Sequence, residues 1–149
     1  EGVICDIGYV IDHTSKTRAI FEINKGVREK LGINVNTRIP KELRRIPFEN
    51  MIYVADGPSD IPSFSVLNER NGRTLGVYQP DSPRDLEQAR MLLDQERVQF
   101  IGPADYRPGS ETHAWLLQTI AEIAERLART PAPTTPRTPF EPTPGHIYD

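Results

Sequence analysis

Two aspartates stand four positions apart in a loop of small residues that directly follows an apolar run. The stretch reads YVADGPSDIP over residues 53–62, with Asp56 behind the apolar run and Asp60 before the next segment. If a parallel strand leads into a helix here, both carboxylates lie at the carboxyl edge of a sheet, where open α/β sheets bind ligands. Two carboxylates at one edge suit Mg²⁺, which is usually held by one or two carboxylates plus waters and substrate phosphate. The sequence leaves a second interpretation open, in which Asp60 caps the helix and Asp56 belongs to a turn.

A lysine further upstream is expected at the same edge. Apolar residues at three- and four-residue spacing predict a helix from about residue 14 to 32, and the helical positions are Ile20, Ile23, Val27 and Leu31. Lys16 lies in the first turn of this helix, whose N-terminus we expect at the carboxyl edge of the sheet. Lys25 lies nine residues further on, about 13 Å along the axis, and cannot share the site. An ammonium group beside a carboxylate-bound Mg²⁺ can hold the oxygens of a phosphate.

The remaining segments predict the elements that would position these side chains. Apolar strands are predicted at 50–55, 73–79 and 97–102, and helices at 61–69, 83–95 and 110–129. The run NMIYVA at 50–55 is apolar without alternation, which predicts a buried parallel strand covered on both faces. Strands that alternate with helices across short links indicate a parallel sheet with helices on its faces. The predicted fold class is therefore α/β, with a Rossmann-like parallel sheet and flanking helices.

Local signals refine these elements. Thr14 or Ser15 can cap the lysine helix, and Gly26 or Gly32 can end it. The last helix is predicted to place apolar residues on one face, at Leu116, Ile120, Ile123 and Leu127. Asp105, in GPADYRP after the third strand, is predicted to be a turn residue. Trp115 is predicted to lie in the core or in an interface.

Composition sets the broad class of the protein. The chain has 149 residues, which suffice for one domain, and its net charge of −3 gives no electrostatic footprint for nucleic acid. A single cysteine, Cys5, cannot form an internal disulfide. No apolar stretch reaches the roughly 20 residues needed to span a bilayer, so we expect a soluble cytoplasmic protein without a membrane partner. The predicted organisation is a β-hairpin or strand at 1–13, the core at 14–129 and a flexible proline-rich tail at 130–149.

Two motifs together resemble a known family. The residues ADGPSDIP after an apolar strand, with HTSKTRAIFEINKG upstream, resemble the fourth and third motifs of the haloacid dehalogenase-like (HAD superfamily) hydrolases, near the phosphoserine-phosphatase-like branch. Ala55 stands where that family commonly has glycine. The resemblance implies that Asp56 is a direct or water-mediated Mg²⁺ ligand and that Asp60 supports the ion or its waters. It implies that Lys16 stabilises the nucleophile and the transferring phosphoryl group of a small phosphorylated metabolite.

The nucleophile of that family is missing from the sequence. The family's chemistry needs a D-x-D loop, in which one aspartate attacks phosphorus and the other is the general acid and base, and no D-x-D occurs here. In VICDIG, Asp6 follows an apolar run, but Gly8 stands where the second aspartate of D-x-D would be. Lys16 comes only ten positions after Asp6, which is too short a stretch for a crossover. We therefore expect the chain to be the C-terminal part of a HAD-like core, with the nucleophile half upstream.

Three functional hypotheses remain at this stage. The first is part of a Mg²⁺-dependent phosphohydrolase, whose missing first strand leaves an apolar sheet edge open to a strand-adding partner or a dimer. The second is a binding or regulatory module that keeps the HAD-like fold without chemistry. The third is a Rossmann-like domain whose aspartates serve only as caps.

Overall fold

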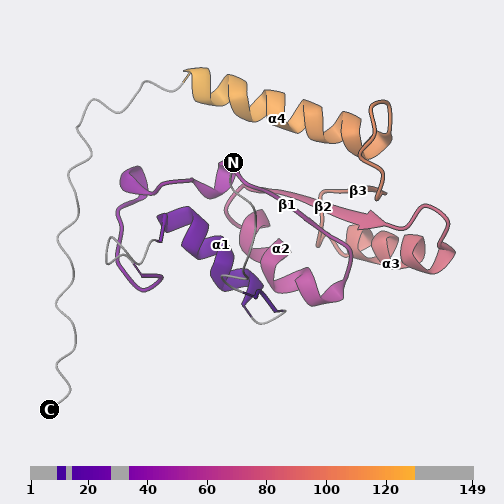
Figure 1. Ribbon diagram of the computed structural model, residues 1–149, viewed down its shortest axis with the longest axis horizontal. Helices are drawn as coiled ribbons and strands as arrows, with labels where there is room; N and C mark the ends of the chain where they lie inside the picture. The colour runs from indigo at the N-terminus through magenta and orange to yellow at the C-terminus, as the bar shows by residue number, and fades with distance from the viewer. Residues whose placement is uncertain (1–9, 13–14, 28–33, 130–149) are drawn as a thin grey trace, which may run out of the picture.

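A three-stranded parallel sheet forms the centre of the protein. The computed structural model describes residues 10–12, 15–27 and 34–129. The strands β1 (Ile52–Ala55), β2 (Arg73–Tyr78) and β3 (Phe100–Pro103) lie in the order β1-β2-β3, and both pairs are parallel. This confirms the α/β class and the parallel sheet expected from the alternation of strands and helices (Figure 1).

Helices cover both faces of this sheet. Helices α1 (Lys16–Lys25), α2 (Ile61–Asn68) and α3 (Pro83–Asp94) lie on one face, and α4 (Glu111–Arg129) lies alone across the other (Figure 1). Short 3₁₀ turns occupy the links, at Lys41–Leu43 (η2), Phe48–Asn50 (η3) and Pro58–Asp60 (η4). Since β1-α2-β2 and β2-α3-β3 step the same way along the sheet, their two helices lie on the same side.

The core on the α1–α3 side consists of two buried clusters. One joins Ile20 of α1, Phe48 of η3 and Leu67 of α2. The other joins residues of α2, α3 and the approach to β3, namely Phe64, Leu92 and Val98. Because α2 contributes to both clusters, it fixes α1 relative to α3, and with them the loops at the carboxyl ends of the strands.

Helix α1 is shorter than its apolar pattern. Gly26 follows Lys25 with φ 69° and ψ 44°, a left-handed C-cap in which its N–H bonds to the carbonyls of Glu22 and Ile23. A Cβ at Gly26 would approach the Cδ of Arg45 to 2.8 Å, so space and backbone both favour glycine here. Of the two glycines considered from the sequence, Gly26 therefore ends the helix, while Gly32 lies outside the described residues.

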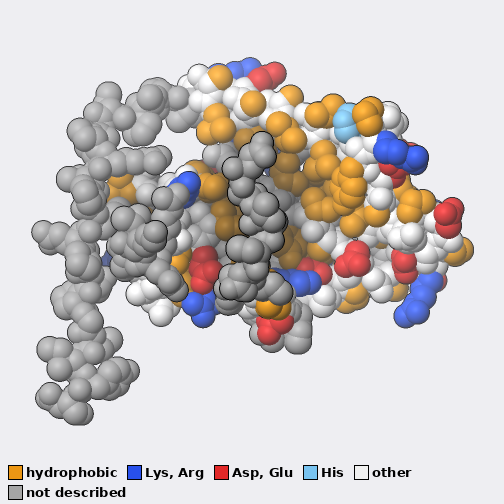
Figure 2. Space-filling view, in the orientation of Figure 1, with side chains coloured by type: hydrophobic (Ala, Val, Ile, Leu, Met, Phe, Trp, Pro, Cys, Tyr) orange, Lys and Arg blue, Asp and Glu red, His pale blue; other side chains and the backbone are white. Residues whose placement is uncertain are grey.

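Two expectations about burial were wrong. The residues of β1 are only half-buried, because β1 is an edge strand of the described sheet, whereas its apolar composition suggested a strand covered on both faces. On α4, Leu116 and Ile123 are half-buried, but Ile120 and Leu127 are each 52% exposed. Figure 2 shows hydrophobic side chains reaching the surface along α4.

The buried face of α4 is partly polar, which explains the second error. Thr112 and Thr119 are its buried residues. The Thr112 hydroxyl donates to the carbonyl of Pro103 at 2.5 Å, so a hydrogen bond to β3 holds the start of the helix. Trp115 stacks on Phe100 with ring centroids 5.4 Å apart, in agreement with the role expected for it.

The predicted hairpin and tail fall largely outside the described residues. Residues 1–9 and 130–149 are not described, and residues 10–12 form neither helix nor strand. In the described part of the chain, every helix is too short or too polar to cross a membrane.

Candidate functional site

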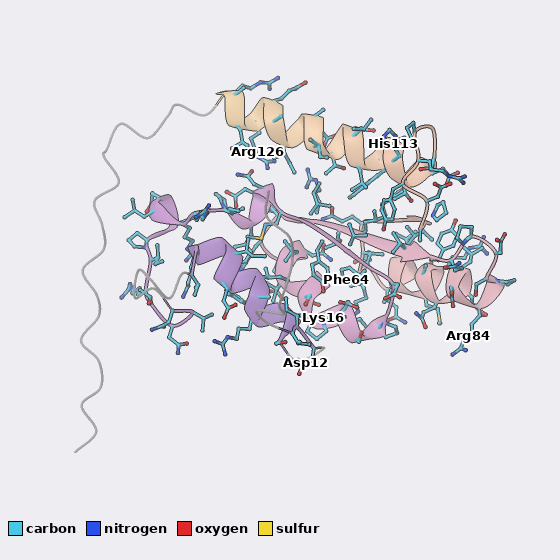
Figure 3. All side chains as sticks on the ribbon, in the orientation of Figure 1. Asp12, Lys16, Phe64, Arg84, His113 and Arg126 are labelled. Carbon is cyan, nitrogen blue, oxygen red and sulfur yellow. The ribbon has the colours of Figure 1, made fainter. Side chains whose placement is uncertain are left out.

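Lys16 and Asp60 form an ion pair that links α1 to the start of α2. The Lys16 Nζ lies 2.8 Å from Oδ1 and 3.0 Å from Oδ2 of Asp60. Asp60 is 1% exposed, whereas the Lys16 side chain is 30% exposed. Figure 3 shows Lys16 at the end of α1 that lies against α2. The structure therefore brings together two of the three residues predicted for the site.

Two neutral donors complete the surroundings of the Asp60 carboxylate. The Tyr53 hydroxyl donates to Oδ1 at 2.6 Å, and the Ser59 hydroxyl donates to Oδ2 at 3.2 Å. With two N–H bonds from Lys16, each carboxylate oxygen accepts two hydrogen bonds, which fills the four acceptor positions of a carboxylate. We call these four residues the Asp60 network.

The Asp60 network shifts the acidity of two of its members. Burial alone would raise the pKa of Asp60, but the hydrogen bonds from Lys16 and Tyr53 outweigh it, so this pKa is lowered. Burial and the hydrogen bond to Asp60 raise the pKa of Tyr53 to about 12. At neutral pH, the centre of the network is therefore a carboxylate paired with an ammonium, with a neutral phenol beside it.

Local structure at the start of α1 and α2 positions the pair. The Asp12 Oδ1 accepts the backbone N–H of Ser15 at 2.8 Å, and the Asp12 carbonyl accepts the N–H of Lys16 at 3.2 Å. Ser15 occupies the N-cap position, one of the two positions predicted for it, but its side chain makes no capping hydrogen bond to the helix. Thr14 lies outside the described residues. The hydroxyls of Thr17 and Ser63 lie 3.2 Å apart and join the two helices next to the ion pair.

The interpretation of Asp60 as a simple helix cap does not fit this geometry. Asp60 occupies the residue before α2, but its side chain makes no capping hydrogen bond. The carboxylate is directed instead to α1 and β1, through Lys16 and Tyr53. A capping aspartate accepts N–H groups of its own helix, so Asp60 serves a different purpose.

Asp56 stands apart from the Asp60 network. It directly follows β1 and is exposed. Its carbonyl accepts the Gln88 Nε2 at 3.0 Å, and within the described ranges its carboxylate has no hydrogen bond or ion pair. The structure thus places a free carboxylate at the carboxyl edge of the sheet, as predicted, but it shows no contact of Asp56 with Lys16 or Asp60.

Of the two aspartates, Asp56 rather than Asp60 has carboxylate oxygens that could bind a magnesium ion. The Asp56 carboxylate is exposed and has no partner in the part of the chain that the structure describes, whereas both oxygens of Asp60 are already saturated. Among the described residues, no three His, Cys, Asp or Glu side chains are grouped as a metal cage. Mg²⁺ often keeps several waters and uses one carboxylate, so one carboxylate is compatible with such an ion. The assignment of Asp56 and Asp60 to a metal stays a prediction.

A surface hollow of about 400 Å³ lies at the carboxyl ends of the three strands, and Asp56 is in its wall. We call it the strand-end hollow. It is lined by side chains from β1, β2, α3 and the loop after β3: Val54, Ala55, Asp56, Val77, Tyr78, Gln79, Asp85, Gln88, Ala104 and Tyr106. Its position corresponds to the place where open parallel sheets bind ligands.

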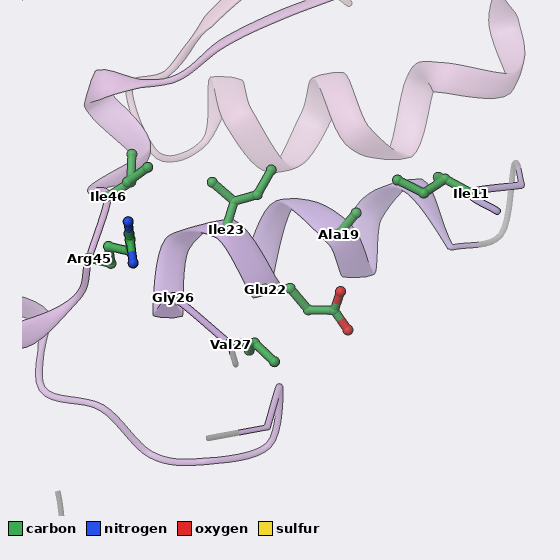
Figure 4. A pocket seen from close by; sticks show the side chains of 8 residues that line it. All are labelled: Ile11, Ala19, Glu22, Ile23, Gly26, Val27, Arg45 and Ile46. Carbon is green, nitrogen blue, oxygen red and sulfur yellow. The ribbon is translucent and has the colours of Figure 1, made fainter. Parts of the chain in front are cut away.

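A second hollow, of about 420 Å³, runs along the outer side of α1. Figure 4 shows Ala19 and Ile23 on the helix, with Arg45 and Ile46 from the following segment near its end. Its wall is mostly apolar and includes neither Lys16 nor an aspartate. Glu22 and Arg45 are the charged residues in this wall, and none of the residues predicted for the site lines it.

Two other charged residues have structural roles. Lys25 donates to the carbonyls of Val35 and Thr37, which confirms that it does not share the site with Lys16. Asp105 accepts the backbone N–H and the guanidinium of Arg107, at 3.0 Å and 2.6 Å, which confirms the predicted turn. These bonds lower the pKa of Asp105 to about 2.

Sequence reasoning missed Tyr53 and Ser59. Tyr53 was included only as part of an apolar strand, although its hydroxyl makes the shortest bond to Asp60. A signal did exist, because a tyrosine within a buried strand needs a hydrogen-bond partner. Ser59 precedes Asp60 directly, and small hydroxyl residues beside an aspartate often serve local bonding.

Comparison with known proteins adds one relative. No protein-family model matches the chain, and no solved structure matches it. An uncharacterized protein of Borreliella burgdorferi is 41% identical over 123 residues, which are 79% of this chain and 40% of that protein. The chain thus spans less than half the length of this relative, whose description assigns no activity. The chain is similar to this protein, and its function rests on the geometry of its site.

Proposed function

We propose that this chain supplies the lysine and the metal-holding carboxylate of a Mg²⁺-dependent phosphohydrolase of the haloacid dehalogenase-like type. The substrate would be a small phosphomonoester. The observation that supports this most is the Lys16–Asp60 pair, buried on its carboxylate side and open on its ammonium side. We propose both the membership of this family and the hydrolytic activity.

The hydrogen-bond geometry of Lys16 suits a phosphate oxygen. An ammonium has three N–H donors, and two of them point at Asp60. No described residue accepts the third, and the side chain is 30% exposed, so solvent or a ligand can reach it. The Asp60 network therefore fixes the ammonium in position while leaving one donor for charge that develops on a phosphoryl group.

Asp56 would hold the metal ion, and Asp60 would act on it only indirectly. A bound Mg²⁺ would neutralise phosphate charge and polarise the phosphorus–oxygen bond for attack. Asp60 contributes by holding the Lys16 ammonium in position, because a saturated carboxylate has no acceptor position left for an ion. This follows the weaker role that the resemblance implies for Asp60, support of the ion rather than direct ligation.

One observation favours a second candidate function. The sequence contains no D-x-D, so the aspartate that would attack phosphorus has no counterpart in this chain. A module that binds phosphorylated ligands through Lys16 and Mg²⁺ without hydrolysing them needs no such aspartate. Release of phosphate distinguishes the two functions, because only the phosphohydrolase releases it.

The test is Mg²⁺-dependent release of phosphate from an aryl phosphate, measured with this chain and with its coding region extended upstream. Release by the extended protein that Asp56→Asn and Lys16→Met each abolish would support the phosphohydrolase. Release by the chain alone would show that a local aspartate or a second subunit supplies the nucleophile. No release from either protein, with Mg²⁺-dependent binding of phosphate retained, would favour the binding module and reject the phosphohydrolase.

A further inference from the structure

Helix α4 carries a row of apolar side chains that is open to solvent. Leu117, Ile120, Ala124 and Leu127 follow one another at spacings of three, four and three residues, so they share one side of the helix. Leu117 is 55% exposed, and Ile120 and Leu127 are each 52% exposed. We call these four residues the α4 seam. Apolar residues at this spacing are typical of a helix that packs against another helix.

The surroundings of the α4 seam suit close packing. Beside it on the helix lie small residues, namely Ala114, Ala121 and Ala128. Apart from Arg126, which bonds to the segment before β1, the charged residues of α4 lie on the opposite side: Glu111, Glu122, Glu125 and Arg129. A second helix on the seam could therefore approach closely without burying a charge.

The α4 seam is directed toward the β1 edge of the sheet. On the opposite side of the helix, Trp115 stacks on Phe100 of β3, with ring centroids 5.4 Å apart. Glu122, also on that side, lies 3.7 Å from Arg73 of β2. Because β3 and β1 are the two edges of the described sheet, the side of α4 that is turned away from β3 faces the space over β1.

The face of β1 below this space is incompletely covered. Tyr53 and Ala55 pack on the other face of the sheet, against the buried cluster of α2 and α3. Side chains alternate along a strand, so Ile52 and Val54 point to the side of α4, and both are only half-buried. The start of α4, held by Thr112, lies over β3, two strand spacings or about 10 Å from β1. Packed helices are 8–10 Å apart, so a helix over β1 would contact both β1 and the seam.

From this geometry we infer that a second helix lies beside α4 over β1, and that the part of a longer protein outside these 149 residues supplies it. The described helices α1, α2 and α3 all lie on the other face of the sheet and cannot fill this position (Figure 1). The relative from Borreliella burgdorferi favours this occupant, because the matched residues make up only 40% of that protein. The inference needs neither Lys16 nor Mg²⁺, so it stands or fails separately from the proposed function.

A membrane surface is a poorer occupant for the α4 seam. Helices that lie on anionic membranes are rich in lysine and arginine on their polar side. Opposite the seam, α4 instead has three glutamates and one arginine. A helix of the same protein requires no such positive charge.

The test is carbene footprinting, read by mass spectrometry, of this chain and of the protein encoded by the full reading frame. We expect labelling of Leu117, Ile120 and Leu127 to be about fivefold lower in the full-length protein, because burial removes most of the accessible area of half-exposed side chains. Labelling of Gln118 and Glu125, exposed on the opposite side of α4, should change less than about twofold.

Leu117→Lys and Gln118→Lys form a matched pair that adds the same charge at neighbouring exposed positions. In this chain, both variants should keep the Tm within about 2 °C of wild type, because both sites are open to water. In the full-length protein, Leu117→Lys should lower the Tm by about 5–10 °C, since it places a charge in an apolar contact, whereas Gln118→Lys should not. Footprinting uses the unaltered proteins, so it decides the inference even where a variant does not fold.

The nature of the covering segment has its own measurement. p-Benzoylphenylalanine in place of Ala121, beside the seam, should cross-link in the full-length protein to a segment with apolar residues at three- and four-residue spacing. Cross-linking to a segment without that spacing would overturn the assignment of a helix.

Several results would overturn the inference as a whole. Equal labelling of the seam in the two proteins would do so, and so would labelling that is already low in this chain alone. Sedimentation velocity tests the competing occupant, because a dimer of either protein that Leu117→Lys dissociates would assign the seam to a second copy. A covered seam in a full-length protein that releases no phosphate would reject only the proposed hydrolysis.

Discussion

The Asp60 network allows a quantitative prediction for Asp60→Asn. The amide keeps the size of the side chain and can still accept the Tyr53 hydroxyl, but it removes the negative charge that faces Lys16. Breaking a fully buried ion pair from one side costs about 3–5 kcal/mol. Because Lys16 is 30% exposed, water recovers part of that loss. We expect the free energy of unfolding to fall by about 2 kcal/mol, in the range of one charge-assisted hydrogen bond.

The matched control is Asp56→Asn, the same change four residues away. Asp56 is exposed and its carboxylate has no partner among the described residues, so we expect a change within about 0.5 kcal/mol. The measurement is urea unfolding, followed by circular dichroism and by the fluorescence of the single tryptophan, Trp115. Similar losses in the two variants would refute the distinction between a saturated and a free aspartate.

A double-mutant cycle with Lys16→Met isolates the pair itself. If the two side chains interact as the distances indicate, the stability losses of the two single variants should sum to about 1–2 kcal/mol more than the loss of the double variant. The pH dependence adds a second criterion. The lowered pKa of Asp60 means that its contribution is present above the unfolded pKa and is lost as pH falls through the folded value. As pH falls below about 4, the difference in stability between wild type and Asp60→Asn should therefore shrink toward zero. A difference that stays constant down to low pH would contradict the ion pair.

Three further predictions concern other parts of the structure. The pKa of Tyr53 is raised to about 12 from 10.0, so its contribution to stability is complete below pH 10 and is lost as pH rises toward 12. Absorbance titration of wild type and of Tyr53→Phe should therefore differ by one phenol that ionises late. NMR titration should place the pKa of Asp105 at about 2, and Arg107→Gln should return it toward its ordinary range, with no change expected if the turn forms otherwise. Gly102→Ala should lower the free energy of unfolding by about 1–3 kcal/mol in thermal unfolding, because the added Cβ would lie 2.4 Å from the Thr112 hydroxyl. Unchanged stability would mean that α4 can move away from β3.

The order of elements could be predicted because each has a strong local signal. Three apolar runs and the helical segments between them correspond to β1–β3 and α2–α4, and Gly26, one of the two glycines considered, ends α1. The buried face of α4 could not be predicted from apolarity, because two threonines occupy it, and one of them, Thr112, is held by a hydrogen bond to β3. The exposure of β1 depends on its place in the sheet, which composition does not report.

Lys16 and Asp60 could be predicted as members of the candidate site, but Tyr53, Ser59 and the bonding between the four residues could not. The expected direction of the helix, with its N-terminus at the carboxyl edge of the sheet, was enough to predict that Lys16 lies near Asp60. The saturation of Asp60 depends on Tyr53, seven residues earlier in the chain, whose ring direction only the packed structure defines. The same contact separates the bonding of the two aspartates, which their spacing in the sequence does not distinguish.

Binding of Mg²⁺ by the Asp56 carboxylate is the central claim and can be measured directly. In an NMR titration of this chain with Mg²⁺, we predict saturable shifts of the backbone amides of residues 55–57 in the millimolar range, abolished by Asp56→Asn. The shifts should persist in Asp94→Asn, which keeps the net charge equal to that of the Asp56 variant. Shifts that do not saturate, or that remain in Asp56→Asn, would contradict the metal site and with it the proposed phosphohydrolase.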